Sequence, residues 1–300
     1  KASYGGGGKG IRVLTNVHDL HQQLRAARQE AAASFLNDDM YLEQFLTTAR
    51  HIEVQVLGTG RKLFILGDRD CSLQLHKQKV LEESPASILT VTQRRTLYDL
   101  SRQLLAGTQY QSLGTIEYLF ADGQFYFMEM NTRIQVEHPV TEMVTGIDLV
   151  KKQVEIAAGE PLNVCQEEVV FQGHAIECRI NAENPDFHFA PSPGKIQNLL
   201  LPAGGMGLRV DSAVYPGYTI PPYYDSMIAK IIVHGNTRFE ALMKMQRALS
   251  EFITEGIITN AEFQMDLISH PAVIAGDYST AFLQEEFLPN WTPETEIGGA

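Results

Sequence analysis

The sequence is poor in cysteine, in tryptophan and in positive charge. Its 300 residues include three cysteines and one tryptophan, and 24 lysines and arginines face 36 aspartates and glutamates, which gives a formal net charge of −12. Such a chain does not supply the broad basic face that nucleic acids or anionic membrane surfaces require. We therefore expect neither nucleic acid nor membrane as a partner, whereas a small anionic substrate stays compatible if basic residues converge locally.

The three cysteines, Cys71, Cys165 and Cys178, are odd in number and lack the paired spacing of a metal site. Such sparse usage suits a reducing compartment, so we predict a cytoplasmic location. No apolar run reaches the about 18 residues of a membrane span, and no signal-peptide pattern is present. The chain begins at Lys1 without an initiating methionine, and its opening residues are typical of the middle of a domain, so we expect further sequence upstream.

The chain does contain 44% hydrophobic residues, enough for one large domain or two to three smaller ones. Apolar spacing and turn residues predict helices and strands without a regular strand–helix–strand rhythm, which favours the α+β class. The predicted helices cover 18–36, 91–109, 146–158 (from a short helical stretch after Pro139), 237–254 and 260–269. The predicted hairpins cover 51–68 and 114–131, and the predicted strands cover 173–181, 194–201, 207–214 and 226–235.

The opening stretch, KASYGGGGKG, places four consecutive glycines between two lysines. Glycine in a run costs backbone entropy and adds nothing to a core, so the stretch is either a flexible linker or a loop whose backbone closely approaches a ligand. Backbone amides flanked by lysines would suit a polyphosphate. The stretch matches neither of the common glycine-rich nucleotide motifs, so both interpretations stay open at this point.

The most informative segment is EMNTRIQVEHP, residues 129–139. If the strand before it continues, Glu129, Asn131 and Arg133 project to one side, and Glu117 lies on the facing strand of the hairpin, whose turn is Asp122-Gly123. Two carboxylates with an amide oxygen are hard oxygen ligands of the kind that Mg²⁺ accepts beside nucleotide phosphates. A surface ladder of salt bridges is the alternative, but Glu117 lies in an apolar context where an unpaired carboxylate would be costly.

These residues resemble biotin carboxylase, the ATP-grasp component of the biotin-dependent carboxylases. The resemblance rests on Lys1 with its glycine loop, on Glu117, on residues 129–139 and on CRINAE at 178–183, and it extends from residue 1 to about 288. It implies an α+β, ATP-grasp fold with a mainly antiparallel C-terminal domain, and it implies that the family's N-terminal domain is missing. The implied parts are a lid remnant at 1–45, a catalytic core at 46–158, a C-terminal domain at 159–288 and a tail at 289–300.

The resemblance also implies roles for individual residues and a set of cofactors: ATP, Mg²⁺ or Mn²⁺, bicarbonate, and biotin as a substrate on a carrier. The metal ligands would be Glu117, Glu129 and Asn131. The ATP-binding residues would be Lys1, Gly5, Gly6, Gly7, Gly8, Glu43, Leu46, His51 and Gln74. The bicarbonate pocket would be Arg133, Gln135 and Val136 with Lys79 nearby, Glu137 would be the general base, and Arg179 would stabilise the biotin enolate.

The implied chemistry agrees with the physical properties of these groups. Bicarbonate becomes nucleophilic when a positioned base removes its proton, and phosphoryl transfer mainly needs charge neutralisation and alignment. A closing glycine lid would protect the carboxyphosphate intermediate from water. Expected partners are a biotin carboxyl carrier, a carboxyltransferase and, at full length, a second copy of the chain. We expect the whole enzyme to be an acetyl-CoA carboxylase of fatty acid biosynthesis.

One departure from the family pattern supports a rival hypothesis. Where the family usually has two arginines followed by His or Asn, this chain has Leu75-His76-Lys77, so a bidentate guanidinium is lost. The chain could then be a nucleotide-binding fragment with little turnover. The other alternative is an ATP-grasp ligase of the carbamoyl-phosphate synthetase type. Met243-Lys244-Met245 looks like a biotin-accepting motif, but it lies in a predicted helix without turn residues, and we interpret it as ordinary helix.

Overall fold

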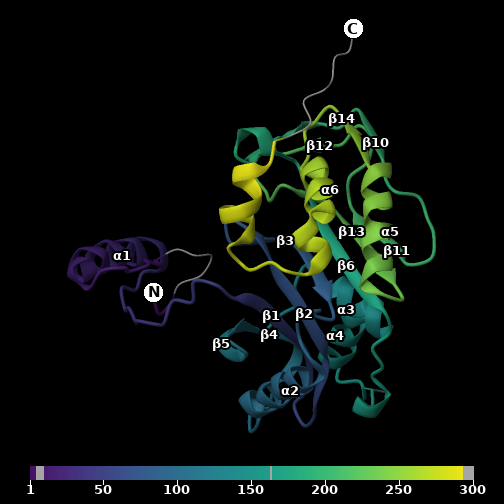
Figure 1. Ribbon diagram of the computed structural model, residues 1–300. Helices are drawn as coiled ribbons and strands as arrows, with labels where there is room; N and C mark the ends of the chain where they lie inside the picture. The colour runs from purple at the N-terminus through teal and green to yellow at the C-terminus, as the bar shows by residue number, and fades with distance from the viewer. Residues whose placement is uncertain (5–9, 163, 293–300) are drawn as a thin grey trace. The chain divides into compact units, whose positions relative to one another are not determined.

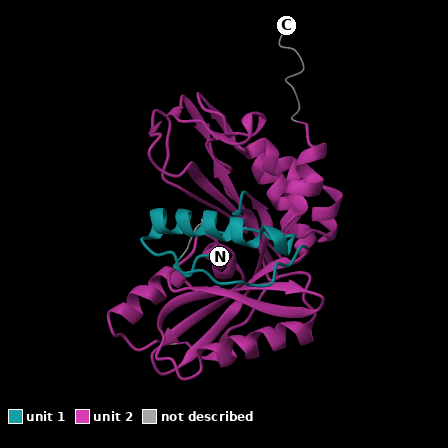
Figure 2. Ribbon diagram, turned by 90° about the vertical axis from the view of Figure 1, so that its left-hand side faces the viewer, with its two compact units in different colours: residues 1–47, 76–78 teal, residues 48–75, 79–300 magenta. Residues whose placement is uncertain are grey.

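The structure is a computed structural model that describes residues 1–4, 10–162 and 164–292. The chain divides into two compact units, residues 1–47 with 76–78 and residues 48–75 with 79–300, coloured separately in Figure 2. Helices and a mainly antiparallel sheet occur in the same unit, which confirms the α+β prediction.

The smaller unit contains one long helix, α1 (Leu20–Phe35), after a 3₁₀ turn η1 (Val17–Asp19). Ala27 and Ala31 are its buried residues, four positions apart and therefore on one face. The helix ends at Leu36, whose left-handed backbone lets its N–H reach the carbonyl of Ala32. The helix predicted over 18–36 is confirmed.

The larger unit is built on an eight-stranded sheet with the order β11-β13-β6-β3-β2-β1-β4-β5 (Figure 1). Its strands are β1 (Arg50–Thr59), β2 (Leu63–Leu75), β3 (Gln78–Ser84), β4 (Gln111–Ala121), β5 (Gln124–Asn131), β6 (His174–Asn181), β11 (Leu208–Ser212) and β13 (Met227–Gly235). Three small two-stranded sheets use β7 (Glu183–Asn184), β8 (Ala190–Pro191), β9 (Gly194–Lys195), β10 (Asn198–Leu200), β12 (Thr219–Ile220) and β14 (Ile253–Glu255).

Helices cover the sheet through separate apolar clusters. Helix α2 packs on β1 and β2 through Leu97, and α4 packs through Leu149 and Ile156 with Leu57. Helices α5 and α6 lie side by side next to β13 and β6 (Figure 1). The helices are α2 (Val91–Leu105), α3 (His138–Thr145), α4 (Leu149–Ala157), α5 (Arg238–Glu251), α6 (Ala261–Ser269) and α7 (Pro271–Ala275), with short turns η2 (Gln166–Glu168), η3 (Pro185–Phe187), η4 (Leu283–Phe287) and η5 (Leu288–Asn290).

Most predicted elements are present, with shorter ends. The single helix expected to follow Pro139 through 158 is two helices, because Gly146 at the end of α3 adopts φ 70° and breaks the run. The strand expected over 194–201 is split into β9 and β10, and β3 was not predicted at all. Met243-Lys244-Met245 lies within α5, as expected for ordinary helix.

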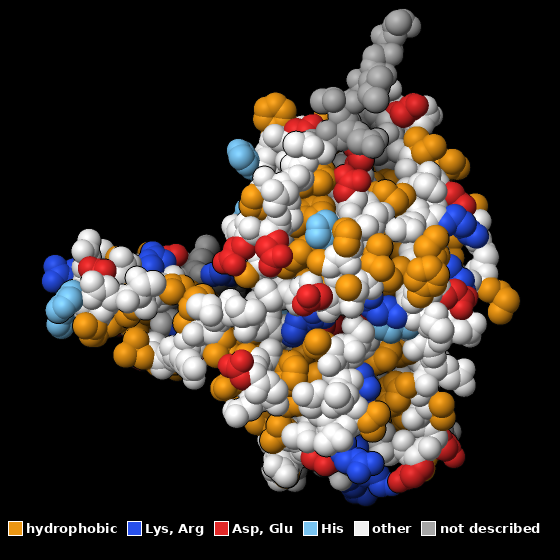
Figure 3. Space-filling view, in the orientation of Figure 1, with side chains coloured by type: hydrophobic (Ala, Val, Ile, Leu, Met, Phe, Trp, Pro, Cys, Tyr) orange, Lys and Arg blue, Asp and Glu red, His pale blue; other side chains and the backbone are white. Residues whose placement is uncertain are grey.

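The positions of charged side chains on the surface can be compared with the expectation, drawn from the net charge, that the chain has no broad basic face. On the face shown in Figure 3, described lysines and arginines lie close to aspartates and glutamates and form no broad basic area. Within the described residues, no helix is long and apolar enough to cross a membrane.

Candidate active site

Four charged residues lie in one row across neighbouring strands. Glu53 on β1 is paired with Arg69 on β2 and, on its other side, with Glu117 on β4. Glu117 is in turn paired with Glu129 on β5. Directly opposed residues of antiparallel strands project from the same face, with β-carbons about 5 Å apart. Three carboxylates in such a row repel one another, so the row requires cations.

The Lys79 ammonium group supplies one of these cations. Its Nζ donates to Glu53, to Glu137 Oε1 at 2.6 Å and to Glu117 Oε1 at 3.3 Å. Burial alone would lower the pKa of Lys79, but Glu53 and the neighbouring carboxylates raise this pKa far above its ordinary value. Burial would likewise raise the pKa of Glu53, yet Lys79 and Arg69 outweigh it and lower that pKa to about 2.

Arg69 is the second cation and is fully buried. Its Nε and Nη2 donate to Glu53 Oε2 at 3.1 and 2.9 Å, and its Nη1 donates to Gln55 Oε1 at 2.7 Å. Nη2 also reaches Gln135 Oε1 at 3.2 Å. A guanidinium whose donors are used in this way fixes the positions of its acceptors, so Arg69 orients Glu53 and Gln135.

Glu137, the predicted base, is held from both sides. It occupies the N-cap position of α3, where the partial positive charge of the helix terminus favours a carboxylate. Its buried side chain accepts from Lys79 through Oε1 at 2.6 Å and from Arg179 Nη2 through Oε2 at 3.0 Å. The structure therefore brings together three of the four residues that the sequence assigns to catalysis: Lys79, Glu137 and Arg179.

The fourth, Arg133, points elsewhere. Strand β5 ends at Asn131, so the alternation that would align Glu129, Asn131 and Arg133 does not extend to Arg133. The Arg133 guanidinium donates to Asn131 Oδ1 at 3.2 Å and to the Ile134 carbonyl at 3.1 Å. The guanidinium next to Glu137 belongs to Arg179 instead.

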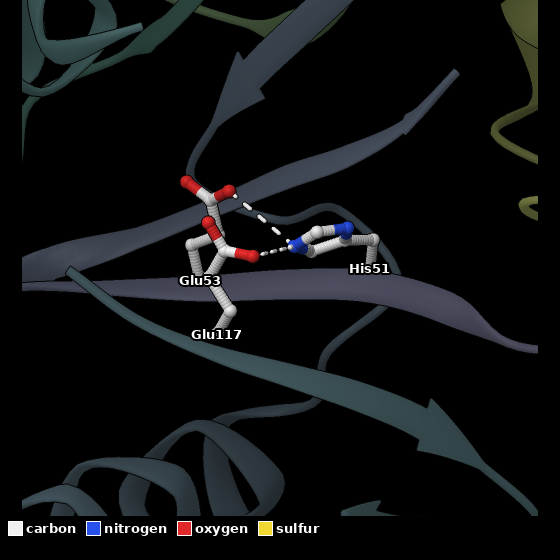
Figure 4. A group of neighbouring side chains, drawn as sticks. All are labelled: His51, Glu53 and Glu117. Atoms are coloured by element: carbon white, nitrogen blue, oxygen red, sulfur yellow. Dashed lines mark ion pairs between the residues drawn. The ribbon is translucent and has the colours of Figure 1, made fainter. Parts of the chain in front are cut away.

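His51 and Gln74, both predicted at the nucleotide, are in contact. Gln74 Nε2 lies 2.7 Å from His51 Nδ1, and the other ring nitrogen, Nε2, points at Glu117 Oε2 (3.1 Å) and Glu53 Oε1 (3.4 Å), as Figure 4 shows. The ligand atoms of His51, Glu53 and Glu117 all lie within 4.8 Å of one another. Because Lys79 Nζ contacts both of these carboxylates, we assign no metal ion to this trio.

The three predicted metal ligands converge at the neighbouring edge of the sheet. Asn131 Nδ2 donates to Glu117 Oε1 at 2.8 Å and to Glu129 Oε1 at 3.4 Å. The Asn131 amide N–H group, which carries a partial positive charge, thus lies between two carboxylates. A divalent cation bound at the same position would be attracted by both of them. Burial would raise the pKa of Glu117, but His51, Lys79 and Gln135 lower it to about 2, so this ligand is ionised. The oxygen donor set fits Mg²⁺ or Mn²⁺.

The two remaining pocket residues lie on the segment between β5 and α3. Gln135 bridges the two halves of the site, because its Nε2 donates to Glu117 Oε1 at 2.7 Å while its Oε1 accepts from Arg69. The carbonyl of Val136 accepts a hydrogen bond from Lys230 Nζ at 2.7 Å. Lys230 on β13 therefore fixes the backbone immediately before Glu137.

The other predicted nucleotide residues belong to the smaller unit. Lys1 Nζ lies 3.5 Å from Glu43 Oε1, and its α-amino group donates to the Tyr41 carbonyl, while Leu46 is half-buried. Gly5, Gly6, Gly7 and Gly8 lie outside the described residues.

Three residues at the centre of the network were not predicted: Glu53, Arg69 and Glu82. Glu53 lies in HIEVQV, and Arg69 lies between Asp68 and Asp70 in GDRDCSLQL; both strands are buried along nearly their whole length. A charge in a buried strand must be paired, so this pattern is the signal that could have found them. Glu82 is less visible because strand β3 itself was missed.

Two family profiles match the chain. Carbamoyl-phosphate synthase L chain, ATP binding domain, matches residues 1–165, and Biotin carboxylase C-terminal domain matches residues 177–285. Biotin carboxylase 1 of Bacillus subtilis is 51% identical over 287 residues, and biotin carboxylase of Pseudomonas aeruginosa is 49% identical over 287 residues. Each alignment covers 95% of this chain and 64% of the relative, so the chain spans less than two thirds of their length.

Solved structures of biotin carboxylases are also similar to this chain. The biotin carboxylase domain of Hydrogenobacter thermophilus 2-oxoglutarate carboxylase, in complex with MgADP, ADP and bicarbonate, matches with a TM-score of 0.91 at 42% identity, over 97% of this chain and 65% of that one. Biotin carboxylase of Campylobacter jejuni, in a β,γ-ATP complex, matches with a TM-score of 0.90 at 42% identity, over 93% of this chain and 63% of that one.

The fold and the arrangement of acids and cations on its sheet define an ATP-grasp protein. Because the C-terminal profile and the similar proteins agree with each other, the chain belongs to the biotin carboxylase family. The family and fold predicted from the sequence are confirmed.

Proposed function

We propose that this chain catalyses the ATP- and bicarbonate-dependent carboxylation of biotin, the first half-reaction of a biotin-dependent carboxylase. The observation that carries the proposal is the buried Glu137 carboxylate, held between Lys79 and Arg179. A carboxylate held beside two cations can take a proton from a small anion that the same cations attract.

The proposed steps use these residues in order. Glu137 removes the proton of bicarbonate while a bicarbonate oxygen attacks the γ-phosphorus of ATP, and ADP leaves. The resulting carboxyphosphate gives its carboxyl group to the ureido nitrogen of biotin and releases phosphate, which takes the proton of that N–H group. Arg179 stabilises negative charge on the biotin oxygen, and Lys79 with Gln135 and Val136 forms the bicarbonate pocket. Arg133, which the sequence also assigns to this pocket, contacts Asn131 and the Ile134 carbonyl in this structure and would have to turn toward bicarbonate.

Nucleotide and metal are assigned to the remaining residues. Glu117, Glu129 and Asn131 would hold Mg²⁺ or Mn²⁺, which neutralises phosphate charge when bound. His51 and Gln74, which contact each other, would lie at the ribose and phosphates. Lys1, Glu43, Leu46 and the glycines at 5–8 would complete the ATP site as a lid.

The rival reaction is that of a carbamoyl-phosphate synthetase, whose ATP-binding domain gives its name to the profile over residues 1–165. The two reactions share ATP and bicarbonate and differ in the acceptor. The match to a biotin carboxylase C-terminal domain, which contributes Arg179, favours biotin. The third possibility, nucleotide binding with little turnover, is supported by the departure at Leu75-His76-Lys77.

One experiment separates the three. ATP hydrolysis is measured with bicarbonate and Mg²⁺ while free biotin or ammonia is added, on this chain and on a version extended upstream to the length of its relatives. Stimulation by biotin alone supports the proposal, and stimulation by ammonia supports the synthetase. No stimulation of either chain by either acceptor would leave nucleotide binding as the function.

Several finer assignments are proposals that extend the main one. As final acceptor we propose acetyl-CoA, with pyruvate and 2-oxoglutarate, the acceptors named in two of the matching proteins, as the alternatives. Partners would be a biotin carrier, a carboxyltransferase and a second copy of the chain. A cytoplasmic location is supported by free thiols at Cys71, Cys165 and Cys178.

A further inference from the structure

Two buried carboxylates face each other directly behind Arg179. Glu82 on β3 and Glu177 on β6 are cross-strand partners, and neither has any exposed surface. Directly opposed residues lie on the same face of the sheet, so the two carboxyl groups share one buried space. Two ionised carboxylates on directly opposed residues in a dry interior would repel each other strongly.

The hydrogen bonds are divided unequally between them. Glu82 Oε1 accepts from Arg179 Nε at 2.6 Å and lies 2.5 Å from Arg179 Nη2 as an ion pair. Glu82 Oε2 and both oxygens of Glu177 have no hydrogen-bond partner among the described residues. Three buried acceptors without a donor are unusual in a folded protein. One proton shared between the two carboxyl groups would supply the missing donor.

No neighbouring cation in the described part of the chain replaces that proton on Glu177. Lys230 Nζ on β13 lies 4.0 Å from Glu177 and donates instead to the Val136 carbonyl. Lys230 is also 3.6 Å from Asp211 on β11, which takes part of its charge. The other charged groups that face the pair are Arg179 on β6, Lys79 on β3 and Glu137 before α3.

The electrostatics agree with the geometry. Burial raises the pKa of Glu177 well above its ordinary value, and the neighbouring Glu82 carboxyl raises it further. Burial also raises the pKa of Glu82, to about 7, although Arg179 opposes this effect. Of the two acids, Glu177, which has neither a hydrogen-bond donor nor a close cation among the described residues, is therefore the one that holds the proton, and Glu82 is the one that ionises beside Arg179.

We propose that Glu82 is a positioning residue that fixes the guanidinium plane of Arg179 next to Glu137, and that Glu177 carries the proton that allows Glu82 to stay ionised. Because Nε and Nη2 share Glu82 Oε1 while Nη2 also reaches Glu137, the guanidinium has one orientation. The inference rests on the proposed role of Arg179 in biotin carboxylation.

The test compares two substitutions of the same kind in the same buried space, Glu82→Gln and Glu177→Gln, in the version extended to full length. Glu82→Gln should lower kcat of biotin-dependent ATP hydrolysis by about tenfold or more, while KM for ATP changes by less than about twofold. Glu82→Asp should restore part of kcat. Glu177→Gln, whose amide can donate as the protonated acid does, should keep kcat within about threefold.

Two spectroscopic readouts do not depend on turnover. The Arg179 Nε–H resonance, assigned with Arg179→Lys, should exchange slowly with solvent in the wild type and in Glu177→Gln, and rapidly in Glu82→Gln. The infrared carbonyl band of a buried protonated carboxylic acid should be present at neutral pH in the wild type and in Glu82→Gln, and absent from Glu177→Gln. Near-UV circular dichroism confirms that each variant is folded.

The inference is overturned if Glu82→Gln leaves both kcat and the Arg179 Nε–H exchange unchanged. It is equally overturned if the infrared band is absent from the wild type or survives in Glu177→Gln. If the wild type shows no biotin-dependent turnover, the proposed function fails, and the resonance and the infrared band still decide whether Glu82 holds Arg179 and Glu177 holds the proton.

Discussion

At the scale of single residues, the site is organised by charge balance. Three cations and four carboxylates are joined by hydrogen bonds into one largely buried chain: Arg69, Lys79 and Arg179 with Glu53, Glu117, Glu137 and Glu82. Removing one partner from a buried ion pair is costly because it leaves the other charge uncompensated. Each member therefore fixes its neighbours, and Glu137 is oriented by Lys79 and Arg179.

Glu53 should contribute to stability in a pH-dependent way. Its pKa in the fold is about 2, below the ordinary value of 4.5, so its stabilising effect is present above pH 4.5 and is lost as pH falls toward 2. Near pH 7, Glu53→Gln should lower the free energy of unfolding by about 3–5 kcal/mol, because Arg69 and Lys79 lose their shared partner.

Urea unfolding at pH 7 and at pH 3 measures this effect. The difference between wild type and Glu53→Gln should be smaller at pH 3. The exposed Glu286→Gln is the control and should stay within about 0.5 kcal/mol of the wild type. An equal difference at both pH values would contradict the assignment.

The metal site gives a second prediction at this scale. Glu129 is exposed and contacts Asn131, so Glu129→Gln should raise the Mg²⁺ concentration for half-maximal ATP hydrolysis by about tenfold while stability changes little. Glu117→Gln should raise it as well and should also destabilise the fold, because Glu117 accepts from Lys79 and Gln135. Unchanged Mg²⁺ titrations in both variants would show that the site lies elsewhere.

Sequence reasoning succeeded at this scale where contacts are local. That Glu117 and Glu129 lie on facing strands could be predicted because Asp122-Gly123 closes one short hairpin. Their direct pairing depends in addition on a register shift between Glu117 and Tyr118, which the turn does not specify. The pairing of Glu82 with Glu177 joins strands nearly a hundred positions apart, and no turn specifies it. Such long-range register depends on how the whole sheet assembles, which local patterns do not encode.

At the scale of elements, the β2–β3 connection explains both a missed strand and the departure from the family pattern. Leu75 ends β2 and is buried in the apolar cluster of the C-terminal helices. His76 and Lys77 form a two-residue turn, both with positive φ, at 50° and 67°. Such turns usually carry Asn-Gly, so His-Lys gives no hairpin signal in the sequence, and β3 went unpredicted. The side chains of His76 and Lys77 are both exposed.

Left-handed backbone is costly for residues with a β-carbon. Replacing His76-Lys77 by Asn-Gly should therefore raise the free energy of unfolding by about 1 kcal/mol. Chemical denaturation measures the change. The matched control is Arg61→Gly in the β1–β2 connection, where the backbone is not left-handed and glycine should give no gain. A loss of stability in the Asn-Gly variant would show that His76 or Lys77 makes a stabilising contact that outweighs the strain.

At the scale of the whole molecule, one sheet connects the two profile matches. Strand β3, from the ATP-grasp match, pairs with β6, from the biotin carboxylase C-terminal match. This pairing brings Arg179 within 3.0 Å of Glu137. The predicted boundary at 158/159 stays a prediction, as do those at 45/46 and 288/289. The candidate site residues could be listed from the sequence, but their supporting network depends on strands from both halves.

The central claim is that Glu137 is the base in the carboxylation of biotin. It is tested most directly by the transfer of isotope-labelled bicarbonate to biotin in the presence of Mg²⁺ and ATP, in the version extended to full length. The account predicts that labelled carboxybiotin forms, and that Glu137→Gln lowers its rate of formation by about 10²-fold or more while ATP binding stays within a few-fold. Near-normal carboxybiotin formation in Glu137→Gln, or ATP hydrolysis without any label in biotin in the wild type, would contradict it.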